Sequence, residues 1–456
     1  MRYAVVTFGC RVNQADSFAL ERQLRAAGGR AAPAETADLV VVNSCSVTAS
    51  ADQGTRQAIR RVARLNPGAR IVATGCYATR DAAAVAALPG VVAVVPNDDK
   101  EALAERLLTL AHADGRDGSL REREAPGPTT AERFGDGDGA CGAPLPPGAA
   151  GRTTYTLRVQ TGCDEVCSYC IIPSTRGRGR SVPLGRVVDE LDRAAEAGYR
   201  EAALTGVHLG SWGRDLTPRA SLPDLLRALD RHPSPVLVRL SSLEPMDCTP
   251  AIVDLVAASP RFAPHFHLPL QHASDAMLRA MRRPYTLDDY RRTVSGIRAR
   301  MPHAAIGSDL IVGFPGETDG DFESTLAYLA QSPLTSLHVF PYSDRPGTAA
   351  SRLGGKVDGA RIRERARAVR EAGAALAGRF RRAQVGTLRP GLTLASGASG
   401  AGGAGGSGAV ALTDNYLKVR IPAGHPENAR VTVRITKAGD TVDGLVVTAG
   451  GPPSAA

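Results

Sequence analysis

The sequence has few cysteines, a single tryptophan and no long apolar run. Eight cysteines among 456 residues are far below the ~8–10% of a disulfide-stapled secreted scaffold. The apolar stretch near the start runs only from Ala4 to Phe8, which is too short for a signal-peptide core of ~7–15 residues. No segment approaches the ~18 apolar residues that span a bilayer. We therefore expect a cytoplasmic protein without a membrane segment, whose reduced thiols are available as metal ligands.

Size and charge set the next limits. At ~150 residues per domain, a chain of this length with 43% hydrophobic residues predicts about three domains, each with its own core. Lysine and arginine number 55 against 46 acidic residues, a net charge of +9. This balance favours an anionic partner such as a nucleic acid without identifying one.

Residues 1–112 repeat one pattern three times: a β-rich apolar run ends just before a cysteine, and a helix-like stretch follows. The runs are Tyr3–Phe8 before Cys10, Asp38–Val42 before Cys45, and Arg70–Thr74 before Cys76. Strands about 30 residues apart with helices between them predict βαβ units and a parallel sheet. Parallel strands end at one edge, so the three cysteines, called here the strand-end cysteines, are expected to meet there. The alternative is three small buried hydrophobic residues.

Residues 113–152 change to glycine, proline, aspartate and arginine without periodicity, which predicts an interdomain linker with an incidental exposed thiol at Cys141. Strand and helix then alternate six times over 153–384, which favours a partial (βα)6 barrel with its chemistry at the carboxyl ends of the strands. Helical stretches are expected between the strands, such as Leu222–Asp230 and Phe322–Ala330, and a long arginine-rich helix, 360–382, closes this region. The expected strands are Tyr155–Gln160, Glu201–Gly206, Val236–Leu243, Phe266–Leu270, Ala305–Val312 and Ser336–Tyr342.

Residues 385–450 have β-like runs, such as Leu417–Ile421 and Ala429–Ile435, and no convincing helix. They predict a small antiparallel β-barrel, followed by a tail over 451–456. Ser396–Gly408 is nearly pure glycine, alanine and serine, which is typical of a flexible loop between two strands. The fold class is therefore α/β with a small all-β domain at the end.

Three thiols stand in the spacing CxxxCxxC directly after the first expected barrel strand, at Cys163, Cys167 and Cys170. We call them the loop cysteines. A zinc ribbon needs a fourth ligand at matching spacing, and no second cysteine pair follows. Three thiolates can instead hold a four-iron cluster that leaves one iron open to a small molecule. A structural zinc ion and a chance group of thiols are the alternatives.

This motif in a (βα)6 chain resembles the radical S-adenosylmethionine superfamily. Further motifs resemble its methylthiotransferases over nearly the whole chain, and the C-terminal barrel is similar to a TRAM domain, an RNA-binding module. The matching segments are 9–14 (GCRVNQ), 43–45 (NSC), 75–76 (GC), 171–181 (IIPSTRGRGRS), 204–210 (LTGVHLG), 308–318 (SDLIVGFPGET), 342–343 (YS) and 345–348 (RPGT).

The resemblance implies a radical enzyme with two [4Fe-4S] clusters and S-adenosylmethionine. The loop cysteines would hold the cluster that cleaves S-adenosylmethionine, and the strand-end cysteines would hold the second cluster. Residues 11–14 and 205–211 look most like the branch that methylthiolates C2 of N6-threonylcarbamoyladenosine at tRNA position 37. The alternatives are the same chemistry on N6-isopentenyladenosine or on a ribosomal-protein aspartate, and a non-catalytic RNA-binding protein with a structural metal. A flavodoxin- or ferredoxin-type electron donor is expected.

Polar residues after the later strands are the candidates for binding S-adenosylmethionine, because ligands of such barrels gather there. Each has a competing interpretation as a helix cap or a hydrogen-bonded core group. The candidates are Gly206, His208, Ser241, Glu244, Gln271 and Asp309. His272 and Ala273 depart from the Ser-Gly that the family has after the glutamine.

Basic residues that fit RNA phosphates lie in two places. Those of the loop after the cluster motif are interpreted as phosphate or cofactor-carboxylate clamps, with internal ion pairs as the alternative. Those of the C-terminal barrel are expected on strand faces, because residues two apart share a face. The candidates are Arg176, Arg178, Arg180, Lys418, Arg420, Arg430 and Arg434.

Three further side chains have a simple interpretation. Trp212 and Tyr416 are candidates for stacking on bases, although a single aromatic is more often part of the core. Cys248 has no motif around it and is expected to be a packing residue.

Overall fold

The computed structural model describes residues 1–112, 147, 153–395 and 408–447. The chain divides into two compact units. The first consists of Met1–Leu145, Thr161–Glu165 and Cys170–Arg178, and the second of Pro146–Gln160, Val166–Tyr169 and Gly179–Ala456. Apart from residue 147, the expected linker with Cys141 lies outside the described residues, as do residues 396–407. Within the described residues, no helix is both long and apolar enough to cross a membrane.

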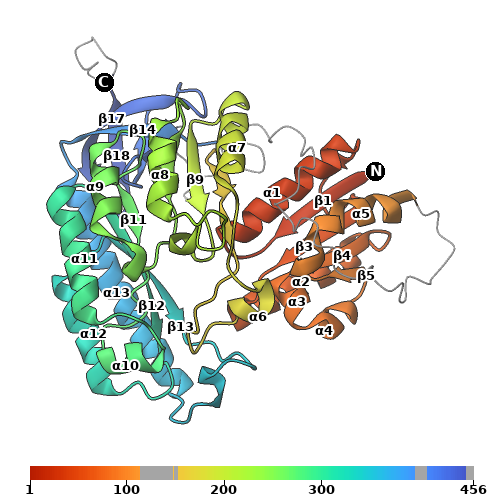
Figure 1. Cartoon of the computed structure of the whole chain (residues 1–456), viewed down its shortest axis with the longest axis horizontal. Helices are drawn as coiled ribbons and strands as arrows, with labels where there is room; N and C mark the ends of the chain where they lie inside the picture. The colour runs from red at the N-terminus through yellow and green to blue at the C-terminus, as the bar shows by residue number, and fades with distance from the viewer. Residues whose placement is uncertain (113–146, 148–152, 396–407, 448–456) are drawn as a thin grey trace. The chain divides into compact units, whose positions relative to one another are not determined.

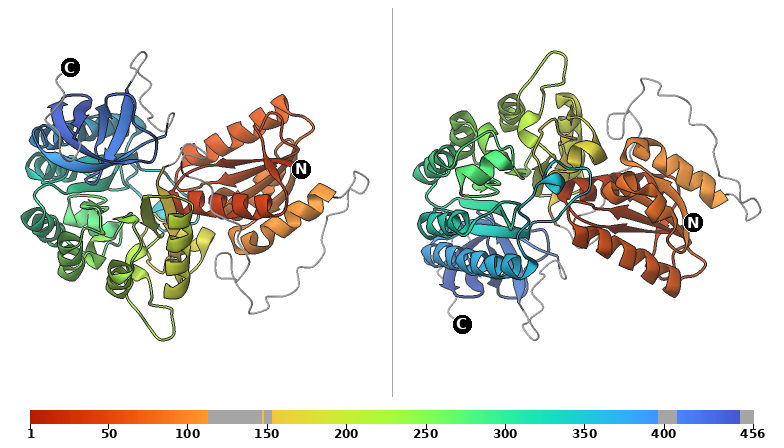
Figure 2. Two further views of the ribbon diagram at one scale, coloured as in Figure 1. Left: turned by 90° about the horizontal axis from the view of Figure 1, so that it is seen from above. Right: turned by 90° about the horizontal axis from the view of Figure 1, so that it is seen from below.

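The first unit is a parallel sheet in the order β2-β1-β3-β4-β5, with helices on both faces (Figures 1 and 2). Its strands are β1 (Arg2–Thr7), β2 (Arg30–Ala31), β3 (Leu39–Ser44), β4 (Arg70–Gly75) and β5 (Val91–Val95). Its longer helices are α1 (Arg11–Ala26), α2 (Ala49–Leu65) and α5 (Leu103–His112), and its short ones are α3 (Cys76–Arg80), α4 (Ala82–Ala86) and the 3-10 helix η1 (Asn97–Ala102).

Alternation along β3 explains why this sheet has two covered faces. Val40 and Val42 belong to one apolar cluster with α2, whereas Leu39 and Val41 belong to another with α1 and α5. A strand buried on both faces is typically an apolar run, and the first four residues of β3, Leu39 to Val42, are all apolar. The three strands expected next to cysteines are confirmed within two residues, and the sequence interpretation missed β2 and β5.

The second unit contains six parallel strands in two hydrogen-bonded groups, β10-β9-β6 and β11-β12-β13. Single bridges, Val238 to Phe262 and Ser242 to His267, connect the two groups, which gives the expected partial barrel. The strands are β6 (Tyr155–Arg158), β9 (Glu201–Thr205), β10 (Leu237–Leu240), β11 (His265–His267), β12 (Ala305–Val312) and β13 (Ser336–Pro341). A short pair, β7 (Gln160–Thr161) and β8 (Arg180–Ser181), flanks the loop cysteines.

Helices cover the outer face of this barrel, as Figure 1 shows for α9, α11 and α12 beside β11 and β12. The longer helices are α7 (Leu184–Glu196), α8 (Leu222–Arg231), α9 (Pro250–Ala258), α11 (Leu287–Arg300), α12 (Asp319–Gln331) and α13 (Gly359–Ala383). The shorter ones are α10 (Asp275–Ala280) and the 3-10 helices η3 (Leu209–Ser211), η4 (Pro245–Asp247) and η5 (Ala350–Arg352). The short helix α6 (Ile172–Arg176) belongs to the first unit.

Local chemistry explains where the expected boundaries were wrong. Helix α12 was expected from Phe322 and begins at Asp319, because Thr318 and Asp321 form a reciprocal capping box. Strand β11 was expected to continue to Leu270 and ends at His267, since Pro269 lacks an N–H for the ladder and Gln271 adopts a positive φ of 68°. Both differences arise from a few residues at or just beyond the element ends.

The C-terminal barrel is closed, in the order β14-β15-β16-β18-β17. Its strands are β14 (Leu388–Thr393), β15 (Ala409–Thr413), β16 (Lys418–Ile421), β17 (Arg430–Ala438) and β18 (Val442–Val446). The expected antiparallel barrel is confirmed with one difference: β16 and β18 pair in parallel. Directions cannot alternate around a ring with an odd number of strands, so one parallel pair is required.

Candidate active site

The strand-end cysteines follow three neighbouring strands of the first unit. Cys10 precedes α1 just after β1, Cys45 directly follows β3, and Cys76 opens α3 directly after β4. Gly9 has a φ of 87°, and a Cβ added to it would lie 2.5 Å from the Cys45 Sγ, so the backbone after β1 closely approaches this thiol. The structure thus brings the three thiols to one edge of the sheet, where the strand pattern placed them.

A buried charge cluster adjoins these thiols. The Asp16 carboxylate accepts a hydrogen bond from Arg176 at 3.0 Å and one from Lys100 at 2.9 Å, and all three side chains are at least 96% buried. Burial lowers the pKa of Arg176, but Asp16 and the thiols of Cys76 and Cys10 outweigh it and leave this pKa above its ordinary value.

The positive charges beside the strand-end cysteines would stabilise a negatively charged group at this edge of the sheet. Burial lowers the pKa of Lys100, which Asp16 opposes. Burial, together with the neighbouring thiols Cys10 and Cys76, raises the pKa of the Cys45 thiol to about 11. Two cations share one carboxylate, and Asn97 Nδ2 donates to the Cys76 Sγ at 3.7 Å. When the thiols bind a metal ion as thiolates, the nearby cations would compensate the negative charge of these thiolates.

The loop cysteines lie in the segment between β7 and β8. All three thiols have intermediate exposure, and three thiols are the donor set that an open-iron cluster requires. The Cys163 N–H donates to the Gly177 carbonyl at 3.1 Å. A Cβ added to Gly162 would lie 1.9 Å from the Arg178 carbonyl oxygen, so only glycine permits this close approach.

Arg283 supports the middle loop cysteine. It donates to the Cys167 Sγ at 3.1 Å, to the Tyr285 hydroxyl at 3.0 Å and to the Glu244 carboxylate. Ser168 donates from its backbone to Met281 and from its hydroxyl to Ala280, which holds the next turn of the loop. An N–H donor to a ligating sulfur adjusts the potential of an iron-sulfur cluster.

Sequence reasoning missed Asp16, Lys100 and Arg283. Only Asp16 carries a visible signal, because it lies between Val12 and Leu20 at helical spacing on the buried face of α1. A charge on an apolar face needs a partner, but the sequence does not name that partner.

The expected S-adenosylmethionine residues all lie in the second unit, in differing environments. His208 is buried, and its Nε2 is 2.7 Å from Asp247. Glu244 pairs with Arg283, and Gly206 lies against Gln160, whose side chain accepts the His208 N–H. Ser241 is buried after β10, and Gln271 has left-handed backbone.

Asp309 differs from the other candidates. It lies inside β12, three residues before the end of the strand, and not at a strand end as expected. Its carboxylate is engaged by His267 and His338. The assignment of these six residues to S-adenosylmethionine stays a prediction.

The basic candidates separate into buried and exposed residues. Arg176 is buried in the Asp16 cluster, so the internal-ion-pair interpretation is correct for it and the phosphate interpretation is wrong. Arg178 is exposed and pairs with Asp164 at 2.9 Å, and Arg180 begins β8 with intermediate exposure.

In the C-terminal barrel, alternation places Lys418 and Arg420 on one exposed face of β16, and Arg430 and Arg434 on one exposed face of β17. Arg430 donates to the carbonyls of Arg200 and Pro235 within the second unit, so part of its donor capacity is used internally. Arg420 pairs with Asp443 at 2.7 Å.

Two of the three remaining candidates belong to the core. Trp212 is 1% exposed and donates to the Val182 carbonyl, and Cys248 is buried, so both are core residues. Tyr416 is 42% exposed, and its ring contacts His265 and the Arg239 guanidinium.

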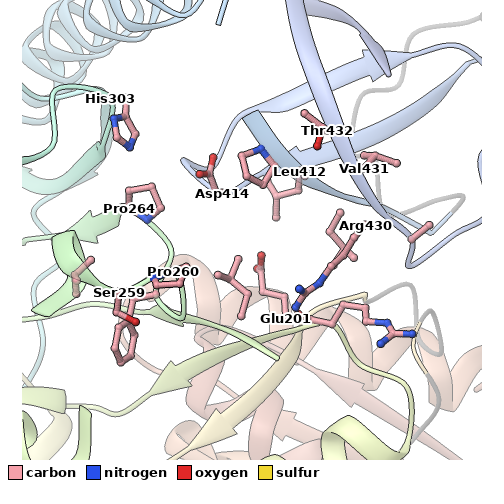
Figure 3. A pocket seen from close by; sticks show the side chains of 18 of the residues that line it. Glu201, Ser259, Pro260, Pro264, His303, Leu412, Asp414, Arg430, Val431 and Thr432 are labelled. Atoms are coloured by element: carbon pink, nitrogen blue, oxygen red, sulfur yellow. Dashed lines mark hydrogen bonds between the residues drawn. The ribbon is translucent and has the colours of Figure 1, made fainter. Parts of the chain in front are cut away.

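A cavity of about 1120 Å³ lies between the C-terminal barrel and the amino ends of the parallel strands. Figure 3 shows Glu201 and Pro264 on one side of it, and Leu412 and Arg430 on the other. It is at the opposite end of these strands from the loop cysteines and is separate from the expected reaction site.

Two family models match the chain. Residues 2–96 match the model described as uncharacterized protein family UPF0004, and residues 157–329 match the radical SAM superfamily. The structure of the radical S-adenosylmethionine methyltransferase TsrM from Kitasatospora setae is similar in fold, with a TM-score of 0.54, 18% identity, and coverage of 76% of each chain.

Similar relatives cover most of the chain. The threonylcarbamoyladenosine tRNA methylthiotransferases MtaB of Bacillus subtilis and Aquifex aeolicus are 35% and 36% identical over 77% and 81% of this chain, and over 76% and 87% of their own. The tRNA-2-methylthio-N(6)-dimethylallyladenosine synthase of Frankia alni is 34% identical over 80% of this chain and 71% of its own. Membership of the radical SAM superfamily implies a [4Fe-4S] cluster and S-adenosylmethionine, and the three loop cysteines fit such a cluster. The chain belongs to the radical S-adenosylmethionine methylthiotransferase family, in the branch of the MtaB relatives.

Proposed function

We propose that this enzyme adds a methylthio group to C2 of N6-threonylcarbamoyladenosine at position 37 of tRNA. The observation that carries the proposal is the match to MtaB relatives at 35% and 36% identity over 77% and 81% of this chain. The dimethylallyladenosine synthase is nearly as similar, but the match extends over 71% of that relative, against 76% and 87% of the two MtaB relatives.

We assign a second [4Fe-4S] cluster to the strand-end cysteines. Three thiols meet at one sheet edge, and the buried cations Lys100 and Arg176 lie beside them. When bound, the cofactors supply a carbon-centred radical at one site and a transferable sulfur at the other. The chain contributes thiolates, positive charge around the strand-end cysteines, and N–H donors to Cys76 and Cys167.

Polar side chains on the inner face of the partial barrel favour an adenosine substrate with a polar substituent on N6. His267, Asp309 and His338 lie on this face, and each histidine is hydrogen-bonded to the Asp309 carboxylate. A dimethylallyl group packed against these side chains would exclude water from them and could not replace the hydrogen bonds that they make to water, which costs binding free energy. A threonylcarbamoyl group offers hydroxyl, carbonyl and carboxylate oxygens and suits this surface better.

We place tRNA contacts on the exposed basic faces of β16 and β17, which carry Lys418, Arg420 and Arg434. Such contacts neutralise phosphates and release counterions, which makes binding depend on salt. We also propose that the enzyme works in the cytoplasm and receives its electrons from a flavodoxin- or ferredoxin-type donor.

Mass spectrometry of tRNA nucleosides tests the substrate. A host strain that lacks its own tRNA methylthiotransferases is complemented with this chain, and a strain that expresses Cys163→Ala is the matched control. We expect 2-methylthio-N6-threonylcarbamoyladenosine only with the unaltered chain. Methylthiolated isopentenyladenosine without this product, or a methylthiolated ribosomal-protein aspartate, contradicts the proposal.

A further inference from the structure

The three last strands of the partial barrel bring two histidines and an aspartate together on one face. His267 is on β11, Asp309 on β12 and His338 on β13, and Asp309 is directly opposite His338 in the parallel register. We call these three residues the His-Asp-His cluster. They come from adjacent hydrogen-bonded strands, so the backbone that carries them is rigid.

The alternation of β13 shows which face this is. Leu337 packs against Gly373 of α13, where a Cβ added to the glycine would lie 3.2 Å from the Leu337 Cβ. His338 therefore points to the opposite, inner side of the barrel. On β12, Leu310 belongs to the apolar core under the helices, so its neighbour Asp309 also faces inward.

The three polar groups converge on one point. The Asp309 Oδ1 is 2.8 Å from the His267 Nε2 and 3.1 Å from the His338 Nδ1, and the three atoms all lie within 4.8 Å of one another. Burial raises the pKa of Asp309, but hydrogen bonds from the two histidines outweigh it and lower this pKa to about 2. The carboxylate is therefore ionised at neutral pH.

From this geometry we propose that the His-Asp-His cluster is a binding site for a divalent transition-metal ion, with Zn²⁺ as the best fit. Zinc bonds to nitrogen and oxygen of ~2.0–2.1 Å at tetrahedral angles place ligand atoms about 3.3 Å apart. The two separations from the Asp309 Oδ1, 2.8 and 3.1 Å, are slightly shorter, so these ligand atoms must move slightly apart for the ion to enter. Two imidazoles and one carboxylate form a donor set that suits first-row metals.

The surroundings leave room for the site and for a further ligand. A Cβ added to Gly307 would lie 2.8 Å from the His267 Nδ1, so glycine at this position leaves the space that the ring occupies. The side chains of His267 and Asp309 are 15% and 22% exposed, whereas that of His338 is 65% exposed. Solvent reaches the cluster from the His338 side, which leaves a coordination position open.

This cluster differs from the cysteine sites. Among the described residues, no other group of three histidine, cysteine or acidic side chains brings its ligand atoms this close. Thiolates of one four-iron cluster bind different irons and so stand further apart, whereas these three groups fit one ion. A bound divalent cation would also make the local charge at Asp309 positive. On the basis of the proposed function, we expect this cation to bind an anionic oxygen of the threonylcarbamoyl group at its open coordination position.

Zinc binding by the iron-loaded enzyme without tRNA tests the site independently of the proposed function. The enzyme with both cysteine sites occupied by iron is dialysed against Zn²⁺ under anaerobic conditions, and metal content is measured. We expect one zinc per chain, and X-ray absorption at the zinc edge should show nitrogen and oxygen neighbours without sulfur. Absence of bound zinc, or sulfur neighbours, overturns the proposal.

Variants assign the zinc to the cluster. His338→Ala removes an exposed ligand with little risk to folding, and Asp309→Asn keeps the size of the side chain; each should lower zinc affinity at least tenfold. The matched control is His232→Ala, because His232 pairs with Asp192 at 2.6 Å and, in the part of the chain that the structure describes, this pair has no third ligand within reach of one ion. Circular dichroism and iron content verify that each variant is folded. Unchanged zinc affinity in His338→Ala and Asp309→Asn refutes the assignment.

Discussion

The buried ion pair between Arg239 and Glu201 gives the sharpest energetic prediction. Arg239 is fully buried on β10 and donates to both oxygens of Glu201, at 3.0 and 2.8 Å. It also donates to the carbonyls of Asp414 and Thr413 in the C-terminal barrel, and its guanidinium lies 5.0 Å from the Tyr416 ring centre. One side chain thus joins the C-terminal barrel to the parallel strands within the second unit.

Replacing this arginine leaves a buried charge without its partner. In Arg239→Met, Glu201 keeps only the hydroxyl of Thr154 as a side-chain donor among its described contacts. Removing one member of a buried pair costs about 3–5 kcal/mol of unfolding free energy. The exposed pair Arg420–Asp443 is the control, with side chains 58% and 33% exposed, and Arg420→Met should cost about 0–1 kcal/mol.

Urea unfolding under anaerobic conditions measures these costs. The only tryptophan of the sequence, Trp212, is buried in the same unit, so its fluorescence reports the unfolding of that unit. The double variant Arg239→Met/Glu201→Gln should regain part of the loss, because it removes the unpaired charge. A cost for Arg239→Met no larger than that for Arg420→Met would refute the reasoning.

Three further predictions concern function. Cys163→Ala should abolish 5′-deoxyadenosine formation, because two thiolates do not hold the open-iron cluster; formation at the unaltered rate would contradict this. Alanine at all three strand-end cysteines should preserve S-adenosylmethionine cleavage and abolish sulfur insertion, and a methylthiolated tRNA product from this variant would disprove the second cluster. Lys418→Ala with Arg434→Ala should weaken tRNA binding and reduce the slope of its salt dependence by about two, while cleavage without tRNA continues. An unchanged slope would show that residues other than these two contact the tRNA phosphates.

Periodic and local features of this chain were predictable from sequence. The apolar run of β3 and its following Cys45 predicted both a buried strand and a thiol at its carboxyl end, because parallel strands share one direction. The alternation in β16 predicted the exposed face of Lys418 and Arg420. These signals lie within a few residues of one another.

Partners far apart in the chain were not predictable. Arg176 was interpreted with equal weight as a phosphate clamp or an internal ion pair, and its partner Asp16 is 160 residues away. Arg283 reaches Cys167 across 116 residues. Such pairs depend on how distant segments pack together, and neither hydrophobic period nor spacing encodes them. The residues of the His-Asp-His cluster are also far apart in the sequence, and they become neighbours because their three strands pair in a particular register.

Iron and sulfide analysis of the reconstituted protein tests the central claim most directly. Two sites with three thiolates each, both holding four irons, predict about eight irons and eight sulfides per chain. Alanine at the three strand-end cysteines should halve both values. Zinc bound by the cysteines in the absence of sulfide, or about four irons in the unaltered chain, would contradict the account.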